Sequence, residues 1–236
     1  MATIDRVYQT VQNAINKEQR GYLTPEEFNS FAHLAQNEIF ELYFHDYNFF
    51  ENARKAGRTN TEYADLPMHF RERINMFSTT ASVTTISADT GAHVVPDNLY
   101  RLTSVEYNGV YVDEEEFDQL RYSERTRLGR SSTTRPVYTR LGNNIRVYPS
   151  ITDGITINYI RRPMVPQWTY TLVAGSGNPL FNESSSTFQD FEIHPADEHE
   201  LTKMILGHAG LTIREPDVTT VAANEEAADL NKQFRV

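Results

Sequence analysis

Apolar residues follow two different spacings along this chain, and the change from one to the other divides it into three parts. From residue 3 to about 77, and again from 195 to 231, they recur at steps of three and four. From 81 to about 192 they come in short runs with alternation, broken by Gly, Pro and Asn. The first spacing is typical of amphipathic helices and the second of strands. The order helix, sheet, helix predicts an α+β fold.

Three helices are predicted before residue 78. The first carries an apolar stripe from Ile4 to Ile15 and ends at Gly21, because glycine commonly follows a helix C-terminus. The second opens with the capping-box sequence of residues 24–27, Thr-Pro-Glu-Glu, and runs to about Ala56. Some 30 helical residues span about 45 Å, more than a small core requires. This excess predicts either packing against a neighbouring subunit or a break near residues 45–46. A third, shorter helix opens at Pro67.

The central part predicts an antiparallel meander, in which the pair Asn108-Gly109 is a strong hairpin turn. The acidic piece 113–118 is expected to form a short helix or helical turn. The stretch 172–186, rich in Gly, Ser and Asn, is expected to be a mobile loop. The predicted strands cover residues 79–86, 99–107, 110–112, 137–141, 145–148, 155–160 and 188–193.

These elements predict a helical domain, built from both ends of the chain, with an antiparallel β domain inserted between its parts. Residues 1–78 and 194–236 would form the helical base, the latter as a helix opening at Pro195 and a tail. Residues 79–193 would form the β insert.

The composition excludes several classes of function. The absence of cysteine removes disulfides, thiolate metal sites and cysteine nucleophiles, and fits assembly in a reducing host cytoplasm. The N-terminal sequence lacks the pattern of a secretory signal, and no apolar stretch approaches the roughly 20 residues of a membrane helix. The net charge of −10 disfavours a phosphate-gripping protein. A local basic patch remains open, either as a binding surface or as a solvated loop; it consists of Arg121, Arg125, Arg127, Arg130 and Arg135.

No motif in the sequence predicts catalysis or a cofactor. Residues 16–27 resemble a calcium loop, with Gly21 at its sixth position and Glu27 at its twelfth, but Arg20 stands where a ligand oxygen is required. A helix end, a turn and a capping box explain these residues more simply. The spacings of His194, His199 and His208 do not place two ligands on one helix face. We therefore expect no metal, and histidines that cap or lie at the surface.

Several segments resemble the β domain of head–tail adaptor proteins of short-tailed phages. The likeness starts at 96–109 (PDNLYRLTSVEYNG) and continues through 135–138, 144–149 and 154–163. The helix start at 194–201 (HPADEHEL) is similar to that of the C-terminal helix in these adaptors, and residues 16–29 resemble virion proteins of crAss-like phages. The likeness covers about two thirds of the chain, and the long N-terminal helices depart from the pattern.

The resemblance implies a non-enzymatic ring protein of the phage neck, located in the virion. It implies a homo-oligomer, commonly of twelve copies, that contacts the portal protein and adjacent tail or ring proteins. At −10 each, twelve copies carry about −120, which would let DNA pass through the lumen without binding. Candidate subunit-interface residues are the aromatics Phe28, Phe31, Tyr43, Phe44, Tyr47, Phe49 and Phe50, for each of which core packing is the alternative. Candidate axial contacts are Tyr111, Phe117, Trp168, Tyr170 and Phe234.

Three other functions remain open at this point. One is a different structural protein of the tail or capsid. Another is an enzyme whose catalytic residues meet only in three dimensions, and the third is a sugar-binding or adhesion module. A pocket with perturbed carboxylates or histidines would favour the enzyme.

Overall fold

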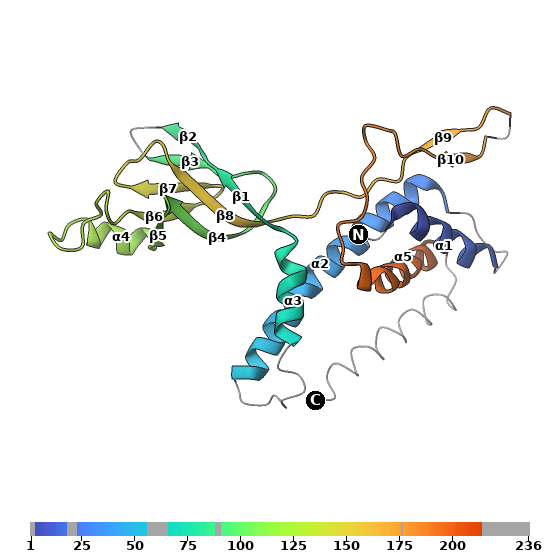
Figure 1. Ribbon diagram of the computed structural model, residues 1–236, viewed down its shortest axis with the longest axis horizontal. Coiled ribbons are helices and arrows are strands. Elements are labelled where there is room, and N and C mark those ends of the chain that lie inside the picture. The colour runs from blue at the N-terminus through green and yellow to red at the C-terminus, as the bar shows by residue number, and fades with distance from the viewer. Residues whose placement is uncertain (1–2, 18–22, 56–65, 88–90, 176, 214–236) are drawn as a thin grey trace. The chain divides into compact units, whose positions relative to one another are not determined.

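The computed structural model describes residues 3–17, 23–55, 66–87, 91–175 and 177–213, which form five α-helices and ten strands (Figure 1). The α+β class is confirmed. The chain divides into two units: residues 1–73 with 163–236, and residues 74–162. The predicted β insert ran to residue 193, whereas the structure assigns residues 163–193 to the same unit as the helices. We call the first the helical unit and the second the barrel unit.

The helical unit is built around one long helix. Helix α2 (Pro25–Lys55) runs for 31 residues without a break, so the alternative of an interruption near residue 45 is wrong. Helix α5 packs against α2 and against α1. The other helices are α1 (Ile4–Lys17), α3 (Leu66–Asn75), the 3₁₀ turn η2 (Pro195–Asp197) and α5 (Glu198–Ile213).

The core of the helical unit follows directly from helical spacing. On α2 the buried side chains recur at steps of three and four residues, which places them on one face. On α5 the buried residues Leu201, Ile205 and Ala209 do the same. The buried apolar side chains of α1 and α2 are Ile4, Val7, Tyr8, Val11, Phe28, Ala32, Ala35, Ile39, Phe40 and Tyr43.

The start of α2 has the predicted capping box. The Glu27 backbone N–H donates to Thr24 Oγ1 at 3.3 Å, and the Thr24 backbone N–H donates to Glu27 Oε2 at 2.9 Å. Hydrogen bonds from Thr24 to the carboxylate lower the pKa of Glu27. The reciprocal pair satisfies donors that the first helical turn leaves open and fixes where the helix begins.

The barrel unit contains an eight-stranded sheet in the order β1-β8-β4-β5-β6-β7-β3-β2. All neighbours are antiparallel except β5 and β6, which pair in parallel. Strands β7 and β8 are consecutive but not neighbours, so the prediction of a simple meander is wrong. The strands are β1 (Ser78–Ser82), β2 (Thr84–Ser87), β3 (Ala92–Val94), β4 (Leu99–Tyr107), β5 (Val110–Glu114), β6 (Val137–Leu141), β7 (Asn144–Tyr148) and β8 (Ile155–Arg161).

The two edges of this sheet belong to one stretch of chain. Strand β1 pairs with β8 at one edge, β2 pairs with β3 at the other, and only Val83 separates β1 from β2. The Val83 N–H donates to the Ile155 carbonyl at 3.2 Å. The sheet therefore closes on itself like a barrel, which leaves few unpaired strand edges.

The inside of the barrel is filled with apolar side chains. Its buried cluster consists of Val95, Leu99, Val105, Val112, Tyr138, Ile145, Val147, Ile151, Ile155, Ile157 and Tyr159. Helix α4 (Phe117–Ser123) packs beside β6 through the buried Leu120. The acidic piece 113–118 was expected to be helical, but its first two residues end β5 and the helix starts only at Phe117. The parallel pairing of β5 with β6 extends the strand through Glu114.

Candidate interaction surfaces

The segment 163–193, which we call the connecting segment, is fixed to α2 by the side chain of Gln36. The Gln36 amide nitrogen donates to the Met164 carbonyl at 2.6 Å, and its amide oxygen accepts from the Glu192 backbone N–H at 3.1 Å. The Glu192 carboxylate accepts from the Met164 N–H at 2.8 Å. Gln36 is 1% exposed. One buried amide therefore joins the two ends of the connecting segment to the helix.

A second amide, one heptad earlier on α2, holds the same segment at Trp168. Asn29 accepts from the Trp168 backbone N–H at 2.8 Å and donates to its carbonyl at 3.1 Å. Helix α1 is held at its N-terminus by Asp190, whose carboxylate accepts from the Ile4 N–H at 2.6 Å. Tertiary side-chain bonds thus order a segment that has little secondary structure of its own.

Trp168 belongs to the core and is not available as the axial contact that the sequence suggested. Its ring is 2% exposed and stacks on Tyr8 with the ring centroids 3.9 Å apart. Its indole N–H donates to Asp5 at 3.1 Å. Tyr170, another predicted axial contact, is half-buried and stacks on Trp168 with a centroid distance of 5.7 Å.

The connecting segment presents a β-hairpin where a mobile loop was predicted. Strands β9 (Tyr170–Leu172) and β10 (Pro179–Phe181) pair antiparallel (Figure 1). The predicted strand over 188–193 is also wrong, since only Gln189 there forms a bridge, to Gln167. Composition suggested a flexible stretch, but the ring of Phe181 stacks on that of Trp168 and fixes the base of the hairpin.

The hairpin and its approach expose apolar side chains almost without charge. Among the 27 residues from 163 to 189, only Glu183 is charged. Interface cores are depleted of charged residues, and soluble proteins normally protect exposed strands with them. We use the name hairpin surface for the exposed apolar side chains of this area, which are Met164, Val165, Leu172, Val173 and Leu180. The register of β9 and β10 places Leu172 and Leu180 on opposite faces of the hairpin, so both faces carry exposed apolar groups.

The predicted interface aromatics on α2 divide into two groups. Phe28 and Tyr43 are 0% and 3% exposed, so they serve the subunit's own core, which corrects the interface prediction for these two. The others are half-buried, and among them Phe50 stacks on Phe70 of α3 at 5.3 Å. This second group is Phe31, Phe44, Tyr47, Phe49 and Phe50.

Tyr43 forms a buried polar cluster with residues far away in the sequence. Its hydroxyl donates to Asp197 at 2.6 Å, and the other oxygen of that carboxylate lies 3.2 Å from the Arg73 guanidinium. Burial, followed by the neighbouring carboxylate, raises the pKa of Tyr43. The cluster connects α2 to η2 and α3, so its role is structural.

The remaining predicted axial contacts lie in the barrel unit or outside the described residues. Tyr111 and Phe117 are exposed. Phe234 lies outside the described residues, as does the predicted tail that contains it.

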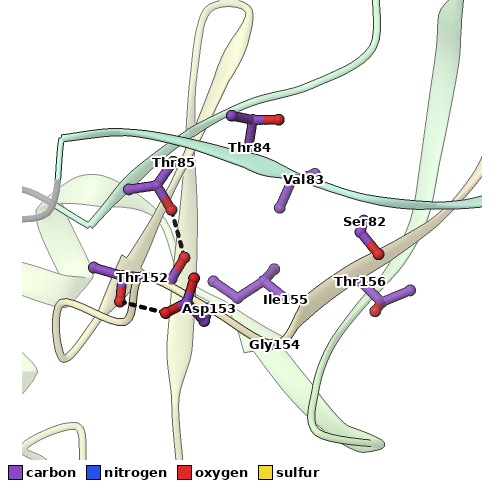
Figure 2. A pocket seen from close by; sticks show the side chains of 9 residues that line it. All are labelled: Ser82, Val83, Thr84, Thr85, Thr152, Asp153, Gly154, Ile155 and Thr156. Carbon is purple, nitrogen blue, oxygen red and sulfur yellow. Dashed lines mark hydrogen bonds between the residues drawn. The ribbon is translucent and has the colours of Figure 1, made fainter.

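A pocket of about 450 Å³ opens where the β1–β2 bend meets the turn before β8. Figure 2 shows its lining of small polar side chains, with Asp153 as the charged one. The Thr85 hydroxyl donates to the Thr152 carbonyl, and Thr85 Oγ1 lies 3.3 Å from His93 Nδ1. His93 Nε2 lies 2.8 Å from the Ile151 carbonyl, and burial lowers the pKa of His93.

This arrangement is structural in its geometry. His93 is 0% exposed and is not part of the pocket lining, so a molecule in the pocket does not reach its ring. Its two nitrogens face Thr85 and a backbone carbonyl, which ties β2, β3 and the 149–154 loop together. The perturbed histidine thus does not supply the accessible base that an enzyme requires.

Among the described residues, no group of three or more His, Asp or Glu side chains is arranged to hold a metal ion. Glu27, the last position of the calcium-like loop, is engaged in the capping box, while residues 18–22 lie outside the described residues. His194 caps η2 by accepting from the Ala196 N–H at 3.2 Å. The prediction of a capping histidine is confirmed at this position.

A family model for the SU10 adaptor protein matches residues 3–233. The chain belongs to the SU10 adaptor protein family. No curated protein matches the chain. As an SU10 adaptor it is a phage structural protein and a component of the virion, in agreement with the resemblance that the sequence showed. The helices of the described residues include none that is both long enough and apolar enough to cross a bilayer.

Sequence inspection missed the residues that build the hairpin surface of this SU10 adaptor. The signal that could have found the surface is the lack of charge over 163–189. Gln36 and Asn29, which hold the connecting segment, have no such signal, because a polar residue on a helix face is ordinarily solvated.

Proposed function

We propose that this SU10 adaptor forms an oligomeric ring in the head–tail connector of a tailed phage, in the manner of crAss-like phage neck ring proteins. The ring, commonly of twelve copies in such connectors, joins the portal protein to the adjacent tail or ring protein. DNA passes through its lumen without specific binding. Membership of a structural adaptor family supports this role and favours a non-enzymatic protein.

The hairpin surface is the observation that carries the proposal. Five apolar side chains are exposed within residues 163–189, which contain a single charge, and Leu172 and Leu180 are 66% and 59% exposed. Covering such a surface with a neighbouring subunit stabilises the complex by about 25 cal/mol for each Å² of apolar area buried. The hairpin is held at its base by the Trp168 stack, so little ordering cost accompanies that burial.

The half-buried aromatics in the last three turns of α2 give the helical unit a second area for contact. Phe44, Tyr47, Phe49 and Phe50 lie within seven residues of one another. Aromatic residues are enriched at interfaces, and a helix longer than its own core requires has room for lateral partners. We assign this area to contacts between copies and the hairpin surface to contacts with neighbouring virion subunits.

The test combines a double variant of the hairpin with a matched control. The full chain is purified with its portal and tail partners, and assemblies are measured by native mass spectrometry and imaged by electron microscopy. We expect rings with the wild type and the control I86S/L141S, which changes two exposed apolar residues of the barrel unit. We expect L172S/L180S to keep its fold but lose binding to a neighbour. A wild-type chain that stays monomeric at high concentration and binds neither partner would contradict the proposal.

A further inference from the structure

Residues 121–135 form a strongly basic surface on a protein whose net charge is −10. They contain five arginines and one acidic residue, Glu124. We call them the arginine loop; they start in the last turns of α4 and project beside the sheet (Figure 1). The barrel unit as a whole has ten acidic and ten basic residues, so its charge is balanced and the basic charge of the loop is a local feature.

The arginine loop is held in a defined conformation. Leu120 of α4 is buried, and the Ser123 hydroxyl donates to Glu115 at 2.9 Å. The Glu124 carboxylate accepts from the Ser131 backbone N–H at 3.0 Å and lies 3.7 Å from the Arg130 guanidinium. Binding of a partner therefore carries little entropic cost for ordering this loop.

Within the described residues, the loop satisfies only part of its own charge: Arg130 pairs with Glu124, and the Arg121 guanidinium lies 5.9 Å from the centre of the Phe117 ring. Arg125, Arg127 and Arg135 are exposed and form no ion pair there. Leu128, between two of them, is 99% exposed, and Tyr122 is 71% exposed. Phosphate groups would bind the arginines, but they offer no apolar surface against which Leu128 could pack. An apolar patch ringed by carboxylates on a protein fits both.

One short stretch of the same unit carries both carboxylates and exposed apolar side chains. Residues 110–118, which we call the acidic stretch, contain five carboxylates and no basic residue. Asp113, Glu116 and Asp118 are exposed. The apolar side chains Val110, Tyr111 and Phe117 are exposed among them, at 53%, 59% and 40%. Glu114 and Glu115 bond to the hydroxyls of Tyr138 and Ser123, not to arginine.

We propose that the arginine loop of one copy docks on the acidic stretch of the next copy. The contact joins two different surfaces of the same unit, so it is heterologous, and repetition of such a contact produces a ring when the rotation closes. Leu128 packs against the apolar side chains of the acidic stretch, and the arginines pair with its exposed carboxylates. This inference rests on the proposed oligomeric ring and names one of its interfaces.

Charge reversal tests the pairing on the full chain. The variants R125E/R127E and D113K/E116K should each weaken self-association by at least about tenfold, because each places like charges face to face. The two variants mixed together, or combined in one chain, should regain assembly, since every contact is then complementary again. The control R101E/R162E reverses two exposed arginines elsewhere in the same unit and should assemble as the wild type does. Sedimentation velocity measures the wild type, the two reversal variants, their mixture, the combined chain and the control at low and high salt.

The outcomes separate this pairing from the ring itself. Wild-type oligomers that persist unchanged in both reversal variants overturn the pairing and leave the ring intact. Loss in R125E/R127E without recovery on mixing also overturns it, and a matching loss of binding to a DNA fragment would assign the loop to nucleic acid. A wild-type chain that stays monomeric overturns the ring, and the pairing with it. Recovery in the mixture, with the loss in each variant alone, supports the pairing.

Discussion

Different kinds of interaction stabilise the helical unit and the barrel unit internally. The barrel is one continuous stretch of chain, and backbone pairing between strands carries its connections. The helical unit joins two stretches that are far apart in sequence, and side chains that bond to backbone groups carry many of its connections. A structure of the second kind depends on a few individual side chains, whereas regular pairing spreads stability over many residues.

The buried tyrosines of the two units show the same difference. Tyr43 donates to Asp197 across 154 residues of sequence, with Arg73 on the other side of the carboxylate. Tyr138 donates to Glu114 at 3.1 Å, between β6 and its neighbour β5, only 24 residues apart. The first bond connects elements between which there is no backbone pairing. The second adds to strands that are already paired through their backbones.

Replacing Trp168 with alanine should give the largest effect and unfold the helical unit preferentially. The change removes the stack on Tyr8 and the bond to Asp5, and leaves a cavity beneath the hairpin. Truncation of a buried tryptophan costs about 3–5 kcal/mol. Hydrogen exchange read by mass spectrometry should show faster exchange in peptides of α1 and α2 and unchanged exchange in β4 and β8. The exposed Tyr122→Ala is the control. Equal acceleration in both units would contradict the comparison.

Replacing Gln36 with leucine should cost about 2–4 kcal/mol, because the Met164 carbonyl and the Glu192 N–H both lose the buried amide that they bond to. Trp168 is the only tryptophan of the chain, so its fluorescence reports on the helical unit alone. The urea midpoint followed by this fluorescence should fall. Gln9→Leu, at an exposed position on α1 with one local bond to Asp5, should leave it unchanged. A midpoint that does not move would show that the Gln36 amide does not stabilise the connecting segment.

The sequence predicts the regular parts of both units well, because regular elements depend on local signals. Helix α2 and the strands β4, β6 and β8 follow from periodicity and caps, which are local. The connecting segment was predicted as a mobile loop and a strand, because its order comes from Asn29 and Gln36 more than a hundred residues away. The closure of the barrel through Val83 was missed because strand order is not encoded in strand periodicity.

The candidate surfaces were predicted less well than the fold. Aromatic type predicts contacts at Phe28, Tyr43 and Trp168, but all three side chains are buried in the core of the helical unit. Both the core and an interface favour aromatics, so type alone does not separate them. The charge pattern of residues 113–135 and the lack of charge over 163–189 are visible in the sequence, and they mark surfaces more directly than aromatic content does.

Replacing Tyr43 with phenylalanine should cost about 1–2 kcal/mol at neutral pH and make the helical unit less sensitive to alkali. The pKa of Tyr43 is raised in the fold. The stability from its neutral form is therefore fully present below the unfolded value of about 10 and is lost as pH rises through the folded pKa. The midpoint temperature of unfolding, measured by Trp168 fluorescence, should fall less steeply from pH 8 to 11 in Y43F than in the wild type.

The corresponding change in the barrel sharpens this result. Burial also raises the pKa of Tyr138, so Y138F should reduce the alkaline sensitivity of the barrel peptides in hydrogen exchange and leave the tryptophan signal unchanged. If Y138F changed the fluorescence transition as much as Y43F does, the two units would unfold as one cooperative unit.

The smallest expected effect is at the capping box of α2. Replacing Thr24 with alanine removes the hydroxyl that caps the helix and should cost about 1 kcal/mol at pH 7. The pKa of Glu27 is lowered by Thr24, so its contribution is present above the unfolded value of about 4.3 and is lost as pH falls through the folded pKa. The difference in unfolding free energy between wild type and T24A should therefore shrink between pH 7 and pH 3. Thr24→Ser keeps the hydroxyl and should match the wild type, whereas a difference that stays constant with pH would show that the carboxylate does not take part in the cap.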